Sequence, residues 1–225
     1  MVITTTDGSL LRLLQLASLS LPVGGFSFSQ GLETAIENGW INDRQETADF
    51  LGTQLRQSLA RLDLPLLLRA LSASENGELE RLNSWNDLAL ACRETKELRL
   101  TDTAMGAALA RLLRHLDLPL PFAPATELSF VIAFACAASH WSINARAAVF
   151  GYGWAWLENQ VAAATKLVPL GQTDAQKLLG ELQQQLPEAL ATAEAIADDA
   201  IGAGLPALAI ASAQHEHQYS RLFRS

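Results

Sequence analysis

Two long stretches in the second half of the chain carry very little charge, residues 127–139 and 144–167. A helix that is apolar on nearly all sides is buried rather than exposed along one face. We therefore expect two central helices around which the other elements pack. Gly151 and Gly153 lie inside the second stretch, where each glycine costs ~1 kcal/mol relative to alanine unless close packing requires it. They predict the close approach of a neighbouring helix.

The rest of the chain carries apolar residues every three or four positions, which is the spacing of amphipathic helices. Proline, glycine or short polar segments interrupt this pattern, and no window alternates as a β-strand does. These signals predict an all-α fold of roughly eight to ten helices. The amphipathic stretches are residues 10–19, 43–63, 66–73, 78–92, 96–117, 173–186 and 188–201.

The proline-rich segment 118–124 is the best candidate for a subdomain boundary, and we interpret it as a linker within one domain. The whole chain, residues 1–225, is thus predicted to be a single-domain multi-helix bundle. Residues 1–8 and 207–225 are expected to be flexible or to be ordered by a partner. The bundle would then finish in a short, flexible C-terminal tail.

Local signals predict where several helices begin and end. Pro65 is expected to end or kink the helix before it, and Pro187 is expected to start another. Capping boxes, in which a polar side chain and the side chain three positions later satisfy backbone amides, predict further helix starts. These pairs are Asn42 with Gln45, Ser27 with Gln30, and Thr173 with Gln176.

The sharpest break in the helical pattern is residues 21–33, which read LPVGGFSFSQGLE. Pro22 makes continuation of the preceding helix unfavourable, and Gly24 and Gly25 permit backbone angles that other residues avoid. One interpretation is a structural corner whose two phenylalanines, Phe26 and Phe28, fill the core. The other is a recognition loop displayed by rigid helices. Spacing alone does not decide between them.

Composition limits the kinds of partner. Sixteen Lys and Arg against 24 Asp and Glu give a formal net charge of −8, which argues against nucleic-acid binding and favours basic partners. Cys92 and Cys136 form no paired motif, as is usual for free thiols in a reducing compartment. No apolar run approaches the ~20 residues of a membrane span, and the N-terminus lacks a signal-peptide pattern. We expect a cytoplasmic protein that binds neither nucleic acid nor membrane.

No motif for a common type of catalysis is present. The chain lacks a phosphate-binding loop, a dinucleotide fingerprint, a nucleophile elbow and the usual zinc templates, so we predict a non-enzyme with no catalytic residue and no cofactor. His215 and His217 are weak candidates for a metal site, since alternate residues of an extended segment point the same way. The alternative interpretation is a solvated polar tail.

Two further features are candidates for partner contacts. Lys166 is the only charged residue between Glu158 and Asp174. It is either a cation that stabilises a helix C-terminus or an ion-pair contact for a partner. The final residues, YSRLFRS at 219–225, alternate bulky and cationic groups, which are common in binding hot spots. Such a tail indicates docking rather than simple fraying.

Several separated motifs together resemble the urease accessory protein UreF family. They are LPVGGFSFSQGLE at 21–33, RLDLPLL at 61–67, ELRLTDTAMG at 97–106, KLVPLGQTDAQ at 166–176 and the tail YSRLFRS at 219–225. The resemblance implies an all-helical protein that forms a homodimer. It also implies assembly with UreD (also called UreH), the nickel-binding GTPase UreG and the urease apoprotein. In this family the protein is proposed to regulate the GTPase during nickel insertion.

The resemblance also suggests which residues meet partners. Gly24, Gly25, Phe26 and Ser27 match the loop motif, Lys166 and Gln172 the second motif, and Tyr219, Arg221 and Arg224 the tail that docks on UreD. Ala175 stands where glycine is common in the family, so the turn after Gln172 departs from the pattern. A competing hypothesis is a helical metallochaperone that holds nickel through the C-terminal histidines.

Overall fold

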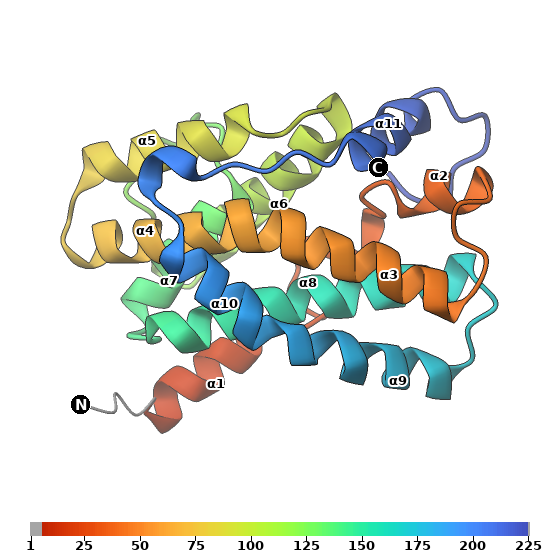
Figure 1. Cartoon of the computed structure of the whole chain (residues 1–225). Coiled ribbons are helices and arrows are strands. Elements are labelled where there is room, and N and C mark those ends of the chain that lie inside the picture. The colour runs from red at the N-terminus through yellow and green to blue at the C-terminus, as the bar shows by residue number, and fades with distance from the viewer. Residues whose placement is uncertain (1–5, 225) are drawn as a thin grey trace.

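The computed structural model describes residues 6–224 and contains eleven α-helices and no strand within that range. Two pairs of helices are continuous with each other, which leaves nine separate helical segments, within the predicted number. Figure 1 shows one bundle, with α1 at one end and the C-terminus beside α2 and α11 at the other. The prediction of a single all-α domain is confirmed.

The two charge-poor stretches form the central helices α7 (Phe130–His140) and α8 (Ala145–Leu167), as predicted. Every residue from 130 to 138 is buried, and α8 fully exposes only Arg146 and Lys166. Phe134 of α7 and Tyr152 of α8 pack edge to face with ring centroids 5.3 Å apart. Of the helices in residues 6–224, none is both long enough and apolar enough to cross a membrane.

The longest helical segment joins α3 (Arg44–Gln54) to α4 (Leu64–Glu75) through a π-helical stretch, Leu55–Asp63. Pro65 lies inside this segment, so of the two predicted outcomes, an end or a kink in the helix, the end is wrong. Proline has no amide proton to donate to the carbonyl of Arg61. The amide of Gly202 donates to that carbonyl instead, at 3.1 Å. The chain thus satisfies the group that the proline leaves free.

The other helices surround this frame. As predicted, Pro187 lies in the first turn of α10, which continues from α9 through a 3₁₀ turn at Gln183–Gln185. The remaining elements are α1 (Asp7–Leu16), a 3₁₀ turn (Gly25–Ser27), α2 (Leu32–Glu37), α5 (Leu79–Ala91), α6 (Lys96–His115), α9 (Gln172–Leu182), α10 (Leu186–Ala195), a 3₁₀ turn (Asp198–Ala200) and α11 (Pro206–His215).

The glycines of α8 lie where neighbouring helices press closest. A methyl group at Gly151 would overlap the side chain of Leu13 from α1, and one at Gly153 would overlap Leu186 from α10. The predicted close approach is confirmed, and side chains rather than backbones make it. An additional glycine, Gly106 of α6, lies directly against the backbone carbonyl of Leu128.

The predicted helix caps are only partly correct. Asp43 rather than Asn42 caps α3 by accepting a hydrogen bond from the amide of Glu46, so the capping box is shifted by one residue. Helix α2 begins after Gly31, whose φ is +82°, and α9 begins after Gly171. Neither of these two helices has a side-chain cap, so the capping boxes predicted at residues 27–30 and 173–176 are wrong.

The C-terminal region is more structured than a tail. Residues 206–215 form α11, and Phe223 is buried in a small second core. That core lies beside the main one and contains Leu32, Ala35, Ile41, Ala163, Ala164, Val168 and Phe223. At the other end, α1 starts at Asp7, so residues 7 and 8 are helical, while residues 1–5 lie outside the described range.

Candidate partner-binding surface

The loop after α1 combines both interpretations of its sequence. Gly24 adopts φ +76°, a left-handed conformation that favours glycine, and the 3₁₀ turn at Gly25–Ser27 follows. Gly25 is buried against the side chain of Asn159. Phe28 is 2% exposed, whereas Phe26 is 59% exposed. One phenylalanine therefore anchors the loop and the other is displayed.

The end of the chain returns to this loop. The amide of Arg224 donates to the carbonyl of Ser27 at 2.8 Å, and the Arg224 guanidinium lies 5.6 Å from the centroid of the Phe28 ring. The Nζ atom of Lys166 lies 5.5 Å from the centroid of the Phe223 ring. Loop, helix α8 and tail therefore form one continuous surface, which we call the loop–tail surface (residues 24–28, Lys166 and 219–224).

A buried histidine fixes α11 beneath this surface. His215 has no exposed area, and each of its ring nitrogens contacts a carboxylate. Nε2 lies 3.1 Å from Oε2 of Glu33 in α2, and Nδ1 lies 2.8 Å from Oε2 of Glu97 in α6. The prediction of a solvated polar tail is therefore wrong at His215, because two carboxylates distant in the sequence enclose it.

The same two carboxylates hold the tail. Glu33 accepts hydrogen bonds from the amides of Leu222 at 2.7 Å and Phe223 at 3.0 Å. The other oxygen of Glu97 contacts Nη1 of Arg221 at 3.1 Å. We refer to His215, Glu33, Glu97 and Arg221 as the His215 cluster. It joins α2, α6, α11 and the tail.

The weak metal candidates do not form a site in this arrangement. Helix α11 runs through His215, so the extended geometry that would align its side chain with that of His217 is absent, and His217 is exposed. Among residues 6–224, no group of three or more histidine, cysteine, aspartate or glutamate side chains is arranged to hold a metal ion.

The other predicted contact residues are distributed unevenly. The structure brings Gly24, Gly25, Phe26, Ser27, Lys166 and Arg224 together on the loop–tail surface. Arg221 points inward to Glu97, and Tyr219 is fully exposed at the start of the tail. Gln172 is exposed at the first position of α9, an element separate from the loop and the tail.

Sequence reasoning did not identify Glu33 and Glu97 as functional candidates. Both lie within quoted motifs, but they are 182 and 118 positions away from His215. Their burial could not be inferred from local pattern, because the residues that enclose them come from distant parts of the chain. A buried glutamate is rare unless it is paired, and here the pairing is entirely tertiary.

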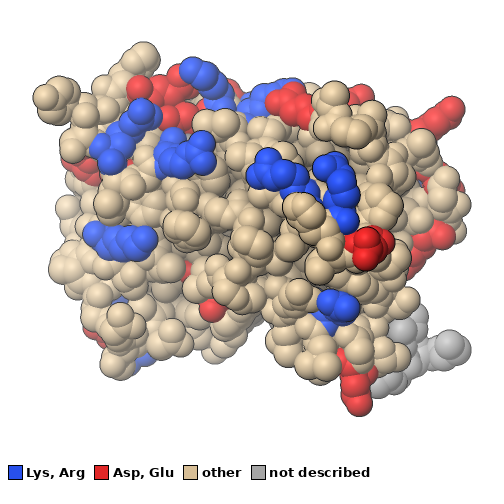
Figure 2. Space-filling model, turned by 180° about the vertical axis from the view of Figure 1, so that it is seen from behind, with Lys and Arg blue, Asp and Glu red and all other residues tan. Residues whose placement is uncertain are grey.

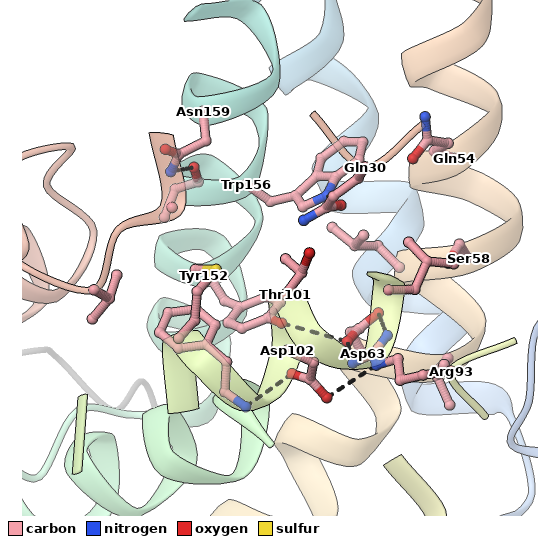
Figure 3. Close-up of a pocket in the computed structure, with 18 of the residues that line it drawn as sticks. Gln30, Gln54, Ser58, Asp63, Arg93, Thr101, Asp102, Tyr152, Trp156 and Asn159 are labelled. Atoms are coloured by element: carbon pink, nitrogen blue, oxygen red, sulfur yellow. Dashed lines mark hydrogen bonds and ion pairs between the residues drawn. The ribbon is translucent and has the colours of Figure 1, made fainter. Parts of the chain in front are cut away.

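A second charged group lies deeper in the molecule, beside a cavity of ≈ 100 Å³. Figure 3 shows Arg93 between Asp63 and Asp102, with Tyr152 alongside. The Arg93 guanidinium contacts Oδ1 of Asp63 at 2.6 Å and Oδ2 of Asp102 at 3.0 Å. Tyr152 donates to Asp63 at 3.4 Å, and Asp102 accepts from the amide of Phe130 at 2.9 Å. We call Arg93, Asp63, Asp102 and Tyr152 the Arg93 cluster.

The charges of the Arg93 cluster are fixed by their surroundings. Burial by itself lowers the pKa of Arg93, but the charges of Asp102 and Asp63 outweigh it and raise this pKa well above its usual value. Burial, reinforced by the charge of Asp63, raises the pKa of Tyr152 well above 10.0. The cluster thus keeps a charged guanidinium and a neutral phenol beside two aspartates, and it joins the π-helical stretch to α6 and α8.

The loop forms one wall of the cavity beside this cluster. Gly25 and Gln30 line it, and Gln30 accepts a hydrogen bond from Nε1 of Trp156 in α8 at 3.0 Å. This bond explains why Gln30 does not take part in a helix cap. The loop is therefore held from both sides, by the core through Gln30 and by the tail through Ser27.

Surface charge is not spread evenly over the acidic chain. Figure 2 shows the face opposite that of Figure 1, where lysine and arginine side chains and several acidic side chains lie on a largely uncharged surface. The formal net charge of −8 therefore does not describe every face.

Comparison with known proteins gives consistent matches along the chain. The UreF family model matches residues 41–183. A urease accessory protein UreF from a Marinomonas species is 60% identical over 99% of this chain and 97% of its own length. The proteins of the same name from Alkalilimnicola ehrlichii and a Pseudomonas putida strain are 47% and 50% identical over 95% and 98% of this chain, and over 95% and 99% of their own lengths.

Proposed function

Because this chain belongs to the UreF family of urease accessory proteins, we propose that its role in urease maturation is that of a non-catalytic scaffold. In this proposal it joins UreD, the GTPase UreG and the urease apoprotein in the cytoplasm. It would also regulate GTP hydrolysis by UreG while nickel is inserted into the apoprotein. The protein itself would hold neither nucleotide nor nickel.

The loop–tail surface is the observation that supports this role most directly. Phe26, Tyr219 and Leu222 are exposed on it, and Lys166 and Arg224 add positive charge. Exposed aromatic and apolar groups surrounded by cations are typical of protein-binding surfaces. The backbone beneath them is already held by hydrogen bonds, so docking would order few additional residues. We assign this surface to UreD.

Lys166 is the residue that we assign to regulation of the GTPase. It lies in the last turn of α8 as an exposed cation whose Nζ atom lies over the Phe223 ring, so its position depends on the docked tail. A cation on an aromatic face is restrained without being neutralised. Lys166→Ala should therefore change the GTP hydrolysis rate of the assembled complex while leaving the fold intact.

Helix α1 supports the proposal of a homodimer. One face packs through Leu13 and Leu16 onto the bundle, while Leu10, Leu11 and Leu14 on the outer face are 46%, 68% and 59% exposed. Three adjacent exposed leucines are unusual on a monomer and typical of an interface. We expect Leu11→Glu to shift the mass measured by light scattering from dimer to monomer.

Reconstitution tests the scaffold directly. The purified chain, UreD and UreG are mixed and resolved by size-exclusion chromatography with light scattering, and the GTP hydrolysis rate is measured on the complex. We expect co-elution of all three proteins and a hydrolysis rate that differs from that of UreG alone. Failure of the chain to co-elute with either partner would overturn the proposal.

A matched pair of variants tests the surface assignment. Leu222→Asp places a charge on the loop–tail surface, whereas Leu79→Asp places one on an exposed leucine at the start of α5. Only the first should reduce UreD binding. Equal binding by both variants would show that the partner docks elsewhere.

A further inference from the structure

The two contacts of His215 depend on the protonation state of its ring. A neutral imidazole carries one N–H and one lone pair, whereas an imidazolium carries two N–H groups. Both neighbours are carboxylates, which accept hydrogen bonds and donate none when ionised. Both contacts of His215 are therefore hydrogen bonds only when the ring is protonated. In a neutral ring, one nitrogen lone pair would face a carboxylate oxygen.

Charge balance within the His215 cluster also favours a protonated His215 ring. With His215 protonated, two cations oppose two carboxylates in a largely buried site. Without that proton, one buried negative charge is uncompensated, which is costly. The other cations of α6 and the tail near this site have other partners: Lys96 pairs with Glu216 at 3.7 Å, Arg99 pairs with Glu127, and the Arg224 guanidinium lies over the Phe28 ring.

The tail depends on this cluster for its path. The side chain of Glu33 holds the amides of Leu222 and Phe223, and one of the accepting oxygens is the atom that faces the His215 ring. Any movement of that carboxylate away from a neutral ring would disturb both amide bonds. From Phe223 the chain continues to the Arg224 contact with Ser27. The protonation of one ring is thus connected to the whole loop–tail surface.

We propose that the imidazolium form of His215 holds residues 219–224 against the loop in the conformation that binds the partner, and that loss of the ring proton releases them. The inference rests on the proposed function, because it takes the loop–tail surface as the docking site. His215 touches no partner in this scheme and is a positioning residue. Tail order and partner binding should both decrease as the pH rises.

One conservative substitution should remove the pH dependence without removing the contacts. In Glu97→Gln the amide oxygen can still accept from Arg221, and the amide nitrogen can donate to Nδ1 of a neutral His215. The Nε2–H group of that ring then donates to Glu33. Every donor has an acceptor with the histidine neutral, so this variant should keep the tail docked at high pH.

Nuclear magnetic resonance can follow both ends of this connection in the full chain. The ¹⁵N shifts of the His215 ring report its protonation, and the order parameters of the Leu222 and Phe223 amides report docking, across a pH series that runs until the ring is deprotonated. As the ring is deprotonated, we expect these order parameters to fall from about 0.85 to below about 0.6. His217→Gln, which alters an exposed histidine, should behave like the wild type.

Tail order in the variants tests the role of His215, and UreD binding tests the docking assignment. His215→Gln should leave the tail mobile at every pH, and Glu97→Gln should keep it ordered at the pH where the wild type releases it. If the order of the tail in the wild type does not change when the His215 ring loses its proton, the inference is overturned. Co-elution with UreD should follow tail order across these samples. Should UreD bind equally to chains with ordered and mobile tails, the docking assignment fails while the His215 connection remains.

Discussion

The Arg93 cluster and the His215 cluster have the same arrangement of charged groups but contain different basic side chains. Each places a nitrogen base between two carboxylates contributed by separate helices, and each is largely buried. The Arg93 cluster lies at the centre of the bundle and joins the long helix α3–α4 to α6 and α8. The His215 cluster lies at one end and joins α2, α6 and α11 to the tail.

The difference between the bases gives the two clusters different roles. Guanidinium does not lose its proton in a protein, so the Arg93 cluster is a permanent connection. An imidazole ring can gain or lose a proton in a protein, so in our proposal the His215 cluster is a conditional connection. The comparison separates the part of the molecule that maintains the fold from the part that we propose as a binding surface.

The largest effect should follow loss of the permanent cation. Arg93→Met leaves two buried carboxylates without a compensating cation, which typically destabilises by about 3–5 kcal/mol. Urea denaturation followed by circular dichroism measures this free energy of unfolding. Arg81→Met is the control, because Arg81 forms an exposed pair with Glu78, and such pairs contribute about 0–1 kcal/mol. A similar loss in free energy of unfolding for the two variants would show that the Arg93 cluster does not stabilise the fold.

A smaller effect should follow disturbance of the backbone that supports Asp102. A methyl group in Gly106→Ala would displace the carbonyl of Leu128, near the Phe130 amide that Asp102 holds. Overpacking of this kind costs about 1–3 kcal/mol. In contrast, Gly180→Ala has open space on α9 and should stabilise by up to about 1 kcal/mol. Differential scanning calorimetry should show melting temperatures that move in opposite directions, and a rise for both would contradict this packing.

The smallest effect concerns the phenol of the Arg93 cluster. Tyr152→Phe removes one hydrogen bond of 3.4 Å, at a cost near neutral pH of about 0.5–1.5 kcal/mol. Because the folded pKa of Tyr152 is raised, its contribution is complete below the unfolded pKa and is lost as the pH rises through and above that value. The difference between wild type and variant should therefore shrink above about pH 10.

Chemical denaturation at several pH values checks this dependence. Tyr219→Phe is the matched control, since Tyr219 is fully exposed, and it should leave stability unchanged throughout. If the difference in free energy of unfolding between wild type and Tyr152→Phe grew with rising pH, the predicted direction of the pH dependence would be wrong.

The sequence was informative wherever local composition determines burial. Absence of charge in residues 130–138 was enough to place α7 at the centre, and the glycines of α8 correctly indicated close packing. The loop at residues 21–33 was identified as a turn, but its two phenylalanines could not be assigned. Arg224 lies over the Phe28 ring and Asn159 lies against Gly25, and both residues reach the loop from distant parts of the chain.

Features that depend on distant partners could not be predicted. Pro65 remains inside a helix because Gly202 supplies a hydrogen bond to Arg61. His215 is buried because Glu33 and Glu97 meet it, although its own surroundings in the sequence are polar. In both cases the local sequence predicted one structure, and contacts with distant residues produced another. The candidate surface was therefore indicated by family resemblance, and its geometry required the structure.

Truncation after Gln218 tests most directly the claim that the fold and the binding surface are held separately. The shortened chain keeps His215, Glu33 and Glu97 but lacks residues 219–225, and its UreD binding and free energy of unfolding are measured together. We predict that UreD no longer co-elutes, while the truncation lowers the free energy of unfolding by less than Arg93→Met does. Undiminished co-elution with the shortened chain would contradict the account.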